Sequence, residues 1–146
     1  MGDVHGDAGA FAYAAATDRF VVQLGDLTDY GPRSDQVLAL MFGLIDAGRG
    51  LFLLGNHDHR LARVLDGQAL RTEGELARTL AQLDPALAAR ARAELGRAPL
   101  WLQQGRTVFV HGGFHTEMLE AASVPLGARR AMGAQARALY GEPTGR

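Results

Sequence analysis

FVVQLGDLTDYGP, residues 20–32, is the stretch that decides the fold of this 146-residue chain. Its first five residues are largely apolar and partly β-branched and are closed by Gly25, which is typical of a short buried strand. Asp26 and Asp29 follow directly. Ligand sites of α/β sheets form beyond the carboxyl ends of the strands. We therefore expect these two carboxylates to lie in a functional site.

Three further blocks place carboxylate, imidazole or amide side chains beside glycine. They are GDVHG at residues 2–6, GNHD at 55–58 and VHGG at 110–113. The last two follow the apolar runs LFLL and TVFV, which indicate two more buried strands. Carboxylate and amide oxygens with histidine nitrogens are the ligands that a pair of divalent metal ions needs.

Helices are predicted between these strands. They cover residues 8–16, residues 35–47, two segments of 73–96 that break near Asp84-Pro85, and residues 128–140. In the second helix, apolar residues recur at helical spacing, Ser34 is expected to act as the N-cap, and Gly48 is expected to end it. The alternation of strand and helix predicts an α/β fold with parallel βαβ units.

Length and composition indicate one soluble globular domain over residues 1–146. The chain is 47% apolar and 21% charged, with a net charge of −1, so its charge balance points to neither a nucleic-acid nor a membrane surface. It contains no cysteine, which excludes disulfides, thiolate zinc sites and cysteine nucleophiles. The absence of a signal segment and of a membrane-length apolar run leads us to expect a cytoplasmic protein.

The four blocks offer ligands for a pair of ions. Asp3 and His5 are two residues apart, so on an extended segment they point to the same side and can chelate one ion. Asp26 can bridge two ions with its two oxygens. Asn56 and His111 offer an oxygen and a nitrogen to the second ion. This mixed set favours Mn, with Fe or Zn as alternatives, over Ca.

A proton donor is also expected beside the metal ligands. His57 follows Asn56 and is well placed to protonate the oxygen of a leaving group. A carboxylate would hold its tautomer and raise its pKa, and the two candidates are Asp29, which we favour, and Asp58.

In this order the four blocks resemble those of the calcineurin-like metallophosphoesterases, and within them the bacterial branch of the phosphoprotein (serine/threonine) phosphatase type. The matching residues are 2–6, 25–31, 55–58 and 111–113. The resemblance implies an αββα sandwich and a phosphoric monoester hydrolase with two divalent metal ions. It implies metal binding by Asp3, His5, Asp26, Asn56 and His111, and general-acid catalysis by His57 paired with Asp29.

The chain departs from the family pattern in two ways. Tyr30 stands where the family has an arginine that clamps the substrate phosphate, and a tyrosine cannot form a charged bidentate pair. Arg33 or Arg60 could take that role. The family's first strand and its C-terminal strands, with a further histidine for the second metal, have no counterpart here. We therefore expect a domain truncated at both ends.

Several substrates and one non-catalytic role fit these residues. A phosphorylated protein or a small phosphate ester is the leading expectation. A nucleotide or a nucleic-acid end is an alternative within the same chemistry, although the neutral charge disfavours nucleic acid. A catalytically incomplete, metal-binding homologue is the alternative from another class.

Overall fold

Two small sheets organise the computed structural model, which describes residues 1–120 and 132–142. Strands β1 (Val21–Gln23) and β2 (Gly50–Phe52) pair in parallel, with Val21 opposite Gly50. Strands β3 (Trp101–Gln104) and β4 (Thr107–Val110) form an antiparallel hairpin. The backbone amide of Leu54 donates to the carbonyl of Pro99 at 2.9 Å, which ties the segment after β2 to the residues that lead into the hairpin. The predicted α/β class is confirmed.

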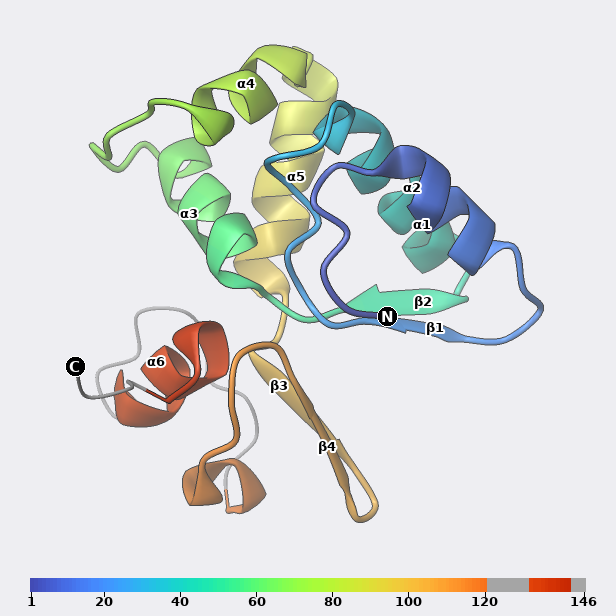
Figure 1. Ribbon diagram of the computed structural model, residues 1–146, viewed down its shortest axis with the longest axis vertical. Coiled ribbons are helices and arrows are strands. Elements are labelled where there is room, and N and C mark those ends of the chain that lie inside the picture. Colours follow the sequence, from blue (N-terminus) through green and yellow to red (C-terminus); the bar gives the residue numbers. More distant parts are fainter. Residues whose placement is uncertain (121–131, 143–146) are drawn as a thin grey trace.

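The helices lie around these sheets in two groups (Figure 1). Their bounds are α1 (Ala8–Ala15), α2 (Ser34–Asp46), α3 (Asn56–Leu65), α4 (Glu75–Gln82), α5 (Pro85–Arg97) and α6 (Met132–Tyr140). Helices α1 to α5 lie together with the β1–β2 sheet, whereas α6 and the short 3₁₀ helix η1 (Thr116–Leu119) lie near the hairpin. The amino end of the predicted last helix, residues 128–131, falls outside the described residues.

One continuous core joins these elements. It includes Phe11 from α1, Leu38 and Met41 from α2, and Leu61 from α3, all of them fully buried. Leu54 is also fully buried and ends the segment that leads into the GNHD block. Burial of each such side chain contributes about 1.5–3 kcal/mol. The core therefore anchors the loops that carry the polar blocks.

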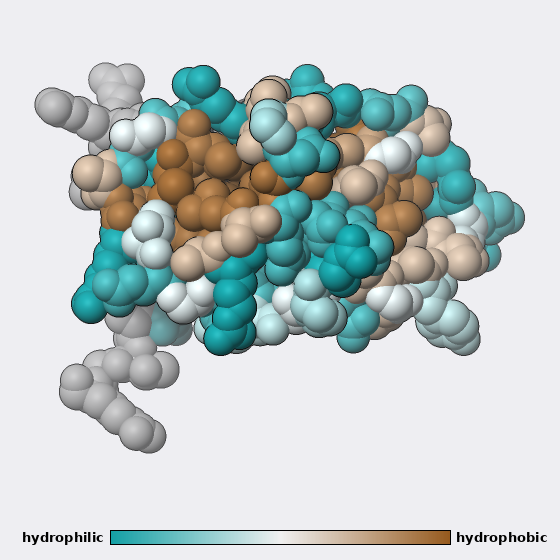
Figure 2. All heavy atoms as spheres, turned by 90° about the horizontal axis from the view of Figure 1, so that it is seen from above, coloured by the Kyte–Doolittle hydropathy of each residue, from teal (hydrophilic) through white to brown (hydrophobic). Residues whose placement is uncertain are grey.

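Apolar side chains also reach the surface. Seen from above, they form a band across the molecule with hydrophilic side chains on both sides (Figure 2). A shallow groove beside α1 and α2 is lined mainly by small apolar residues, Ala8, Ala12, Ala39 and Leu40 among them. Among the residues described, no helix has the length and apolar character needed to cross a membrane.

Two expectations about the elements were wrong, and one helix was not expected. The TVFV run is not a third buried parallel strand, because it pairs with β3 in a hairpin and is only partly buried. Helix α3 was not expected, since it begins within the polar GNHD block. Ser34 does not cap α2: Arg33 is the N-cap residue, and the Ser34 hydroxyl instead accepts a hydrogen bond from the Asp29 amide at 3.1 Å.

Candidate metal centre

The loops after β1 and β2 meet because these two strands run in parallel. The GDVHG block is added to them by backbone hydrogen bonds. The amides of Val4 and His5 donate to the Asp26 carbonyl at 3.0 and 2.9 Å. Met1 bonds on either side of Gln23, as a residue of a parallel strand would: its amino group donates to the Val22 carbonyl and its carbonyl accepts from the Leu24 amide, both at 2.7 Å. These bonds hold the first block against β1 and the loop that follows it.

Glycine allows the blocks to approach one another this closely. A Cβ atom on Gly55 would overlap the Asp26 amide nitrogen and its Oδ1 atom. A Cβ atom on Gly25, where φ is +101°, would lie 2.7 Å from the backbone of Gly55. The second and third blocks can touch only because both positions lack a side chain.

Backbone strain gathers at the same place. Among the described residues, four that are not glycine have a positive φ angle: His5 (+47°), Asp26 (+57°), Asp29 (+72°) and Tyr30 (+57°). All four belong to the first two blocks. The expectation that Asp3 and His5 sit on one extended segment was therefore wrong, because His5 is left-handed. Such residues persist where the surrounding structure holds them, typically at functional sites.

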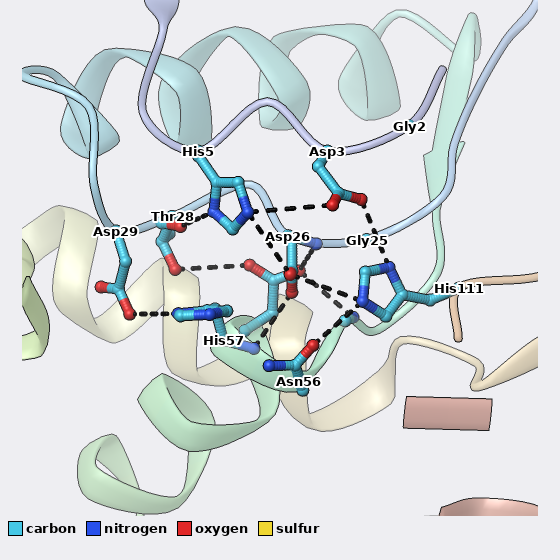
Figure 3. A network of polar contacts seen from close by, with 12 residues as sticks. Gly2, Asp3, His5, Gly25, Asp26, Thr28, Asp29, Asn56, His57 and His111 are labelled. Carbon is cyan, nitrogen blue, oxygen red and sulfur yellow. Dashed lines mark hydrogen bonds and ion pairs between the residues drawn. The ribbon is translucent and has the colours of Figure 1, made fainter. Parts of the chain in front are cut away.

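Asp26 is the centre of two groups of possible metal ligands (Figure 3). Its Oδ2 atom lies 3.7 Å from His5 Nε2 and 3.4 Å from His111 Nε2. Asp3 reaches both histidines, with Oδ2 3.8 Å from His5 Nε2 and Oδ1 3.7 Å from His111 Nδ1. Asn56 Oδ1 lies 3.0 Å from His111 Nε2. Ligands around a tetrahedral ion with bonds of ~2.1 Å lie ~3.4 Å apart, so this spacing suits metal binding.

The two histidine rings are oriented by the backbone. His5 Nδ1 lies 3.0 Å from the Thr28 carbonyl, and His111 Nδ1 lies 2.9 Å from the Leu24 carbonyl. A carbonyl only accepts, so each Nδ1 carries the hydrogen and donates it. Each Nε2 then faces Asp26, where it can offer its electron pair to an ion once it carries no proton. This backbone support is typical of histidines that bind metals.

The electrostatics of the centre favour an ionised Asp26. Burial opposes its ionisation, but hydrogen bonds and positive charge from His111 and His57 outweigh burial and lower the pKa of Asp26. Hydrogen bonding to Asp26 in turn raises the pKa of the His111 imidazole, against the effect of burial. Each of the two groups therefore favours the charged form of the other, and a bound cation would have to displace the imidazole proton.

His57 is linked to a buried polar chain. Its Nδ1 atom lies 2.7 Å from Asp29 Oδ2, and Asp29 is only 1% exposed. The Thr79 hydroxyl, from α4, donates to Asp29 Oδ1 at 2.6 Å, and Ser34 lies 3.4 Å from Thr79. The Asp29 carboxylate is thus held on both oxygens. Sequence reasoning missed Thr79, because nothing local marks one hydroxyl in an amphipathic helix as a partner of a loop 50 residues away.

Asp58 was the alternative candidate for the carboxylate that pairs with His57, but it bonds to backbone amides instead. It is fully buried and accepts hydrogen bonds from the amides of Asp26, Leu27 and Gly55 at 2.7, 3.0 and 3.3 Å. Burial and the nearby charge of Asp26 raise its pKa to about 6, although these amide bonds act in the opposite direction. Asp58 therefore braces the second block against the third.

The expected phosphate-binding side chains lie in different surroundings. The Tyr30 ring is 62% exposed and packs edge-on against the rings of His5 and His57, with centroids 4.8 and 5.0 Å away. Arg33 is bound at two points by Asp35, at 2.9 and 2.8 Å. Arg60 lines a pocket that also includes Asn56 and His57. Of the two arginines, Arg60 therefore opens toward the centre, while Arg33 is already paired.

Comparison with known proteins identifies the family. The family model described as calcineurin-like phosphoesterase matches residues 1–131. Two curated relatives are asymmetrical bis(5'-nucleosyl)-tetraphosphatases PrpE. The protein of Bacillus velezensis is 33% identical over 110 residues, which are 68% of this chain and 44% of the relative. The protein of a Geobacillus species is 29% identical over 131 residues, 84% of this chain and 50% of the relative.

A solved structure shows the same fold. The metallophosphoesterase of Sphaerobacter thermophilus matches with a TM-score of 0.57 and 24% identity, over 77% of this chain and 45% of that protein. This confirms the metallophosphoesterase type of fold. The chain spans about half the length of the curated relatives it matches.

Proposed function

Because the chain belongs to the calcineurin-like phosphoesterase family, we propose that it hydrolyses phosphoesters with the help of two divalent metal ions. The observation that carries the proposal is the central position of Asp26. It is a member of both ligand groups, one with His5 and His57 and the other with Asp3 and His111. A shared carboxylate between two nitrogen-containing groups is the arrangement that a two-ion site requires.

The residues fit two such ions. One would be held by Asp3, His5 and Asp26, and the other by Asp26, Asn56 and His111. Manganese is the proposed native metal, with iron or zinc as alternatives, because the donors combine oxygen and imidazole nitrogen. When bound, the ions would supply Lewis-acid polarisation of a phosphoryl oxygen and a nucleophile near neutral pH.

His57 is proposed as the general acid. Its Nδ1 atom is engaged by Asp29, so Nε2 is the atom that can give a proton to the leaving-group oxygen. The same Nε2 atom could instead serve as a ligand of the first ion, since His57 shares a ligand group with His5 and Asp26. We favour the acid role because Asp29, bonded to Nδ1, fixes the orientation of the imidazole that would give the proton. The two roles differ in their effect on metal content when His57 is replaced.

The proposed substrates are small phosphate esters, with nucleoside polyphosphates ahead of phosphorylated proteins. The names of the curated relatives support this order, because both are bis(5'-nucleosyl)-tetraphosphatases. A catalytically incomplete metal-binding homologue is the second candidate. It is favoured by the exposed Tyr30 in place of a cationic clamp.

The test is metal-dependent turnover by the purified chain. We expect added Mn to activate hydrolysis of p-nitrophenyl phosphate and of diadenosine tetraphosphate, with a phosphopeptide as the third substrate. Asp26→Asn and His111→Ala should lose bound metal by elemental analysis and lose turnover with it. Asp46→Asn, a surface change on α2, is the matched control and should lose neither. If the chain binds metal and cleaves none of the three compounds, the hydrolase proposal is wrong and the incomplete homologue is correct.

A further inference from the structure

A second feature adjoins the candidate metal centre. A pocket of about 340 Å³ opens along α3 and the loop that follows it. Its described lining residues are Asn56, His57, His59, Arg60, Arg63, Leu70, Arg71 and Tyr140. Three of these eight are arginine and none carries a carboxylate. The volume lies within the ~300–1,000 Å³ range typical of small-molecule sites.

We propose that this pocket binds the part of a nucleoside polyphosphate that lies beyond the reacting phosphorus. The three arginines would hold the non-reacting phosphates, and Tyr140 would stack on the base. The inference rests on the proposed function only in that it places the reacting phosphate at the metal centre. His57, a member of one ligand group, and Asn56, in contact with His111, both line the pocket, so a ligand held at the centre would extend into it.

The arginines have donors to spare. Arg60 gives one hydrogen bond to the Arg71 carbonyl at 2.8 Å, and Arg63 gives one to Gln68 at 2.7 Å. A guanidinium has five N–H donors, so each keeps most of its donors for phosphate oxygens. Arg71 pairs with Glu73 at 2.9 Å, but both side chains are strongly exposed. Exposed pairs are worth little, so a polyphosphate can take over Arg71 at small cost.

The field within the pocket is positive. Burial, and after it the charge of Arg63, lowers the pKa of the His59 imidazole. A phosphoserine or an aryl phosphate has a single phosphate group, which the metal centre would occupy. Three further positive charges beside that centre suit a ligand with additional phosphates.

The pocket also offers apolar side chains to a base. Tyr140 ends α6 and is 66% exposed, and Leu70 is another of the lining residues. An exposed tyrosine ring offers a flat apolar surface on which a purine can stack. The pocket thus combines cations with an aromatic ring, the two kinds of group that bind the phosphates and the base of a nucleotide.

The first test compares substrates across variants of the full chain. Arg63→Gln and Arg71→Gln should each lose about five- to tenfold more kcat/KM on diadenosine tetraphosphate and inorganic tripolyphosphate than on p-nitrophenyl phosphate. Arg71 lies in a loop with its side chain 81% exposed, so its replacement leaves the fold intact. Arg106→Gln, in the turn of the β3–β4 hairpin, is the matched control. Equal losses on all three substrates, or no loss, would overturn the inference.

The second test separates the nucleoside from its phosphates. Tyr140→Leu should lose about tenfold on diadenosine tetraphosphate and nothing further on tripolyphosphate. Equal behaviour on both compounds would refute the stacking role.

A third measurement keeps the pocket distinct from the proposed activity. Calorimetric binding of inorganic tripolyphosphate to the purified chain should weaken about five- to tenfold in either arginine variant. Arginine-dependent binding without cleavage would sustain the pocket and defeat the hydrolase. Cleavage, together with tripolyphosphate binding that does not depend on the arginines, would defeat the pocket and sustain the hydrolase.

Discussion

Replacement of Thr79 by valine should damage the protein because it removes the hydroxyl that holds Asp29. The Thr79 hydroxyl donates to Asp29 Oδ1 at 2.6 Å, and Asp29 is 1% exposed, so water cannot take its place. Valine keeps the shape of threonine and has nearly the same helix propensity, so packing and helix formation change little. A hydrogen bond to a charged group is worth about 1.5–3 kcal/mol. We expect the free energy of unfolding to fall by about 2 kcal/mol.

The same change should also weaken catalysis through His57. With one oxygen released, Asp29 can rotate away from the imidazole that it orients. We expect kcat to fall about tenfold, by analogy with the cost of misplaced catalytic groups, while KM changes little. Urea unfolding measures the first effect in metal-free buffer, and turnover of p-nitrophenyl phosphate at saturating Mn measures the second.

Two controls isolate the hydroxyl. Thr79→Ser keeps the donor and should retain most of the stability and of kcat. Thr72→Val, in the exposed loop before α4, makes the same chemical change away from Asp29 and should shift stability by less than about 0.5 kcal/mol. If Thr79→Ser is as damaging as Thr79→Val, the effect comes from packing and the hydrogen-bond argument fails.

Three further perturbations test the centre itself. His57→Ala should keep its metal and lose about 10²–10⁴-fold in turnover, most severely on poor leaving groups; loss of metal in elemental analysis would instead make His57 a ligand. Gly55→Ala should lose metal affinity in a Mn titration, because the added Cβ overlaps Asp26. An unchanged titration would refute that steric argument. Tyr30→Arg should lower KM for phosphate esters by supplying a charged clamp, and an unchanged KM would count against the clamp.

Much of the fold was readable from the sequence because its signals are local. Helix α2 and the break at Pro85 follow from apolar spacing, glycine and proline, and the structure confirms both. The β3–β4 hairpin was missed because WLQQ at residues 101–104 has neither a continuous apolar run nor clean alternation. Helix α3 was missed because its first turn consists of polar residues whose pattern indicates a site rather than a helix.

The sequence predicted which residues come together in the candidate site, but not which contacts hold them there. The four blocks contain the side chains that the structure brings together around Asp26. Their roles stay predictions. The contacts that hold them, from the Met1 backbone to Asp58 and Thr79, join residues that are far apart in the chain. No local pattern encodes such pairs, so only the fold reveals them.

The left-handed residues of the first two blocks set a limit on how stable this protein can become. Each such non-glycine residue lowers the stability of the fold by roughly 1–2 kcal/mol. Four of them, His5, Asp26, Asp29 and Tyr30, lie in these two blocks. Glycine at these positions would relax the backbone but remove the side chains that the proposed chemistry needs. Selection for thermal tolerance should therefore leave His5, Asp26 and Asp29 untouched. Tyr30 is where a stabilising glycine or asparagine should emerge first.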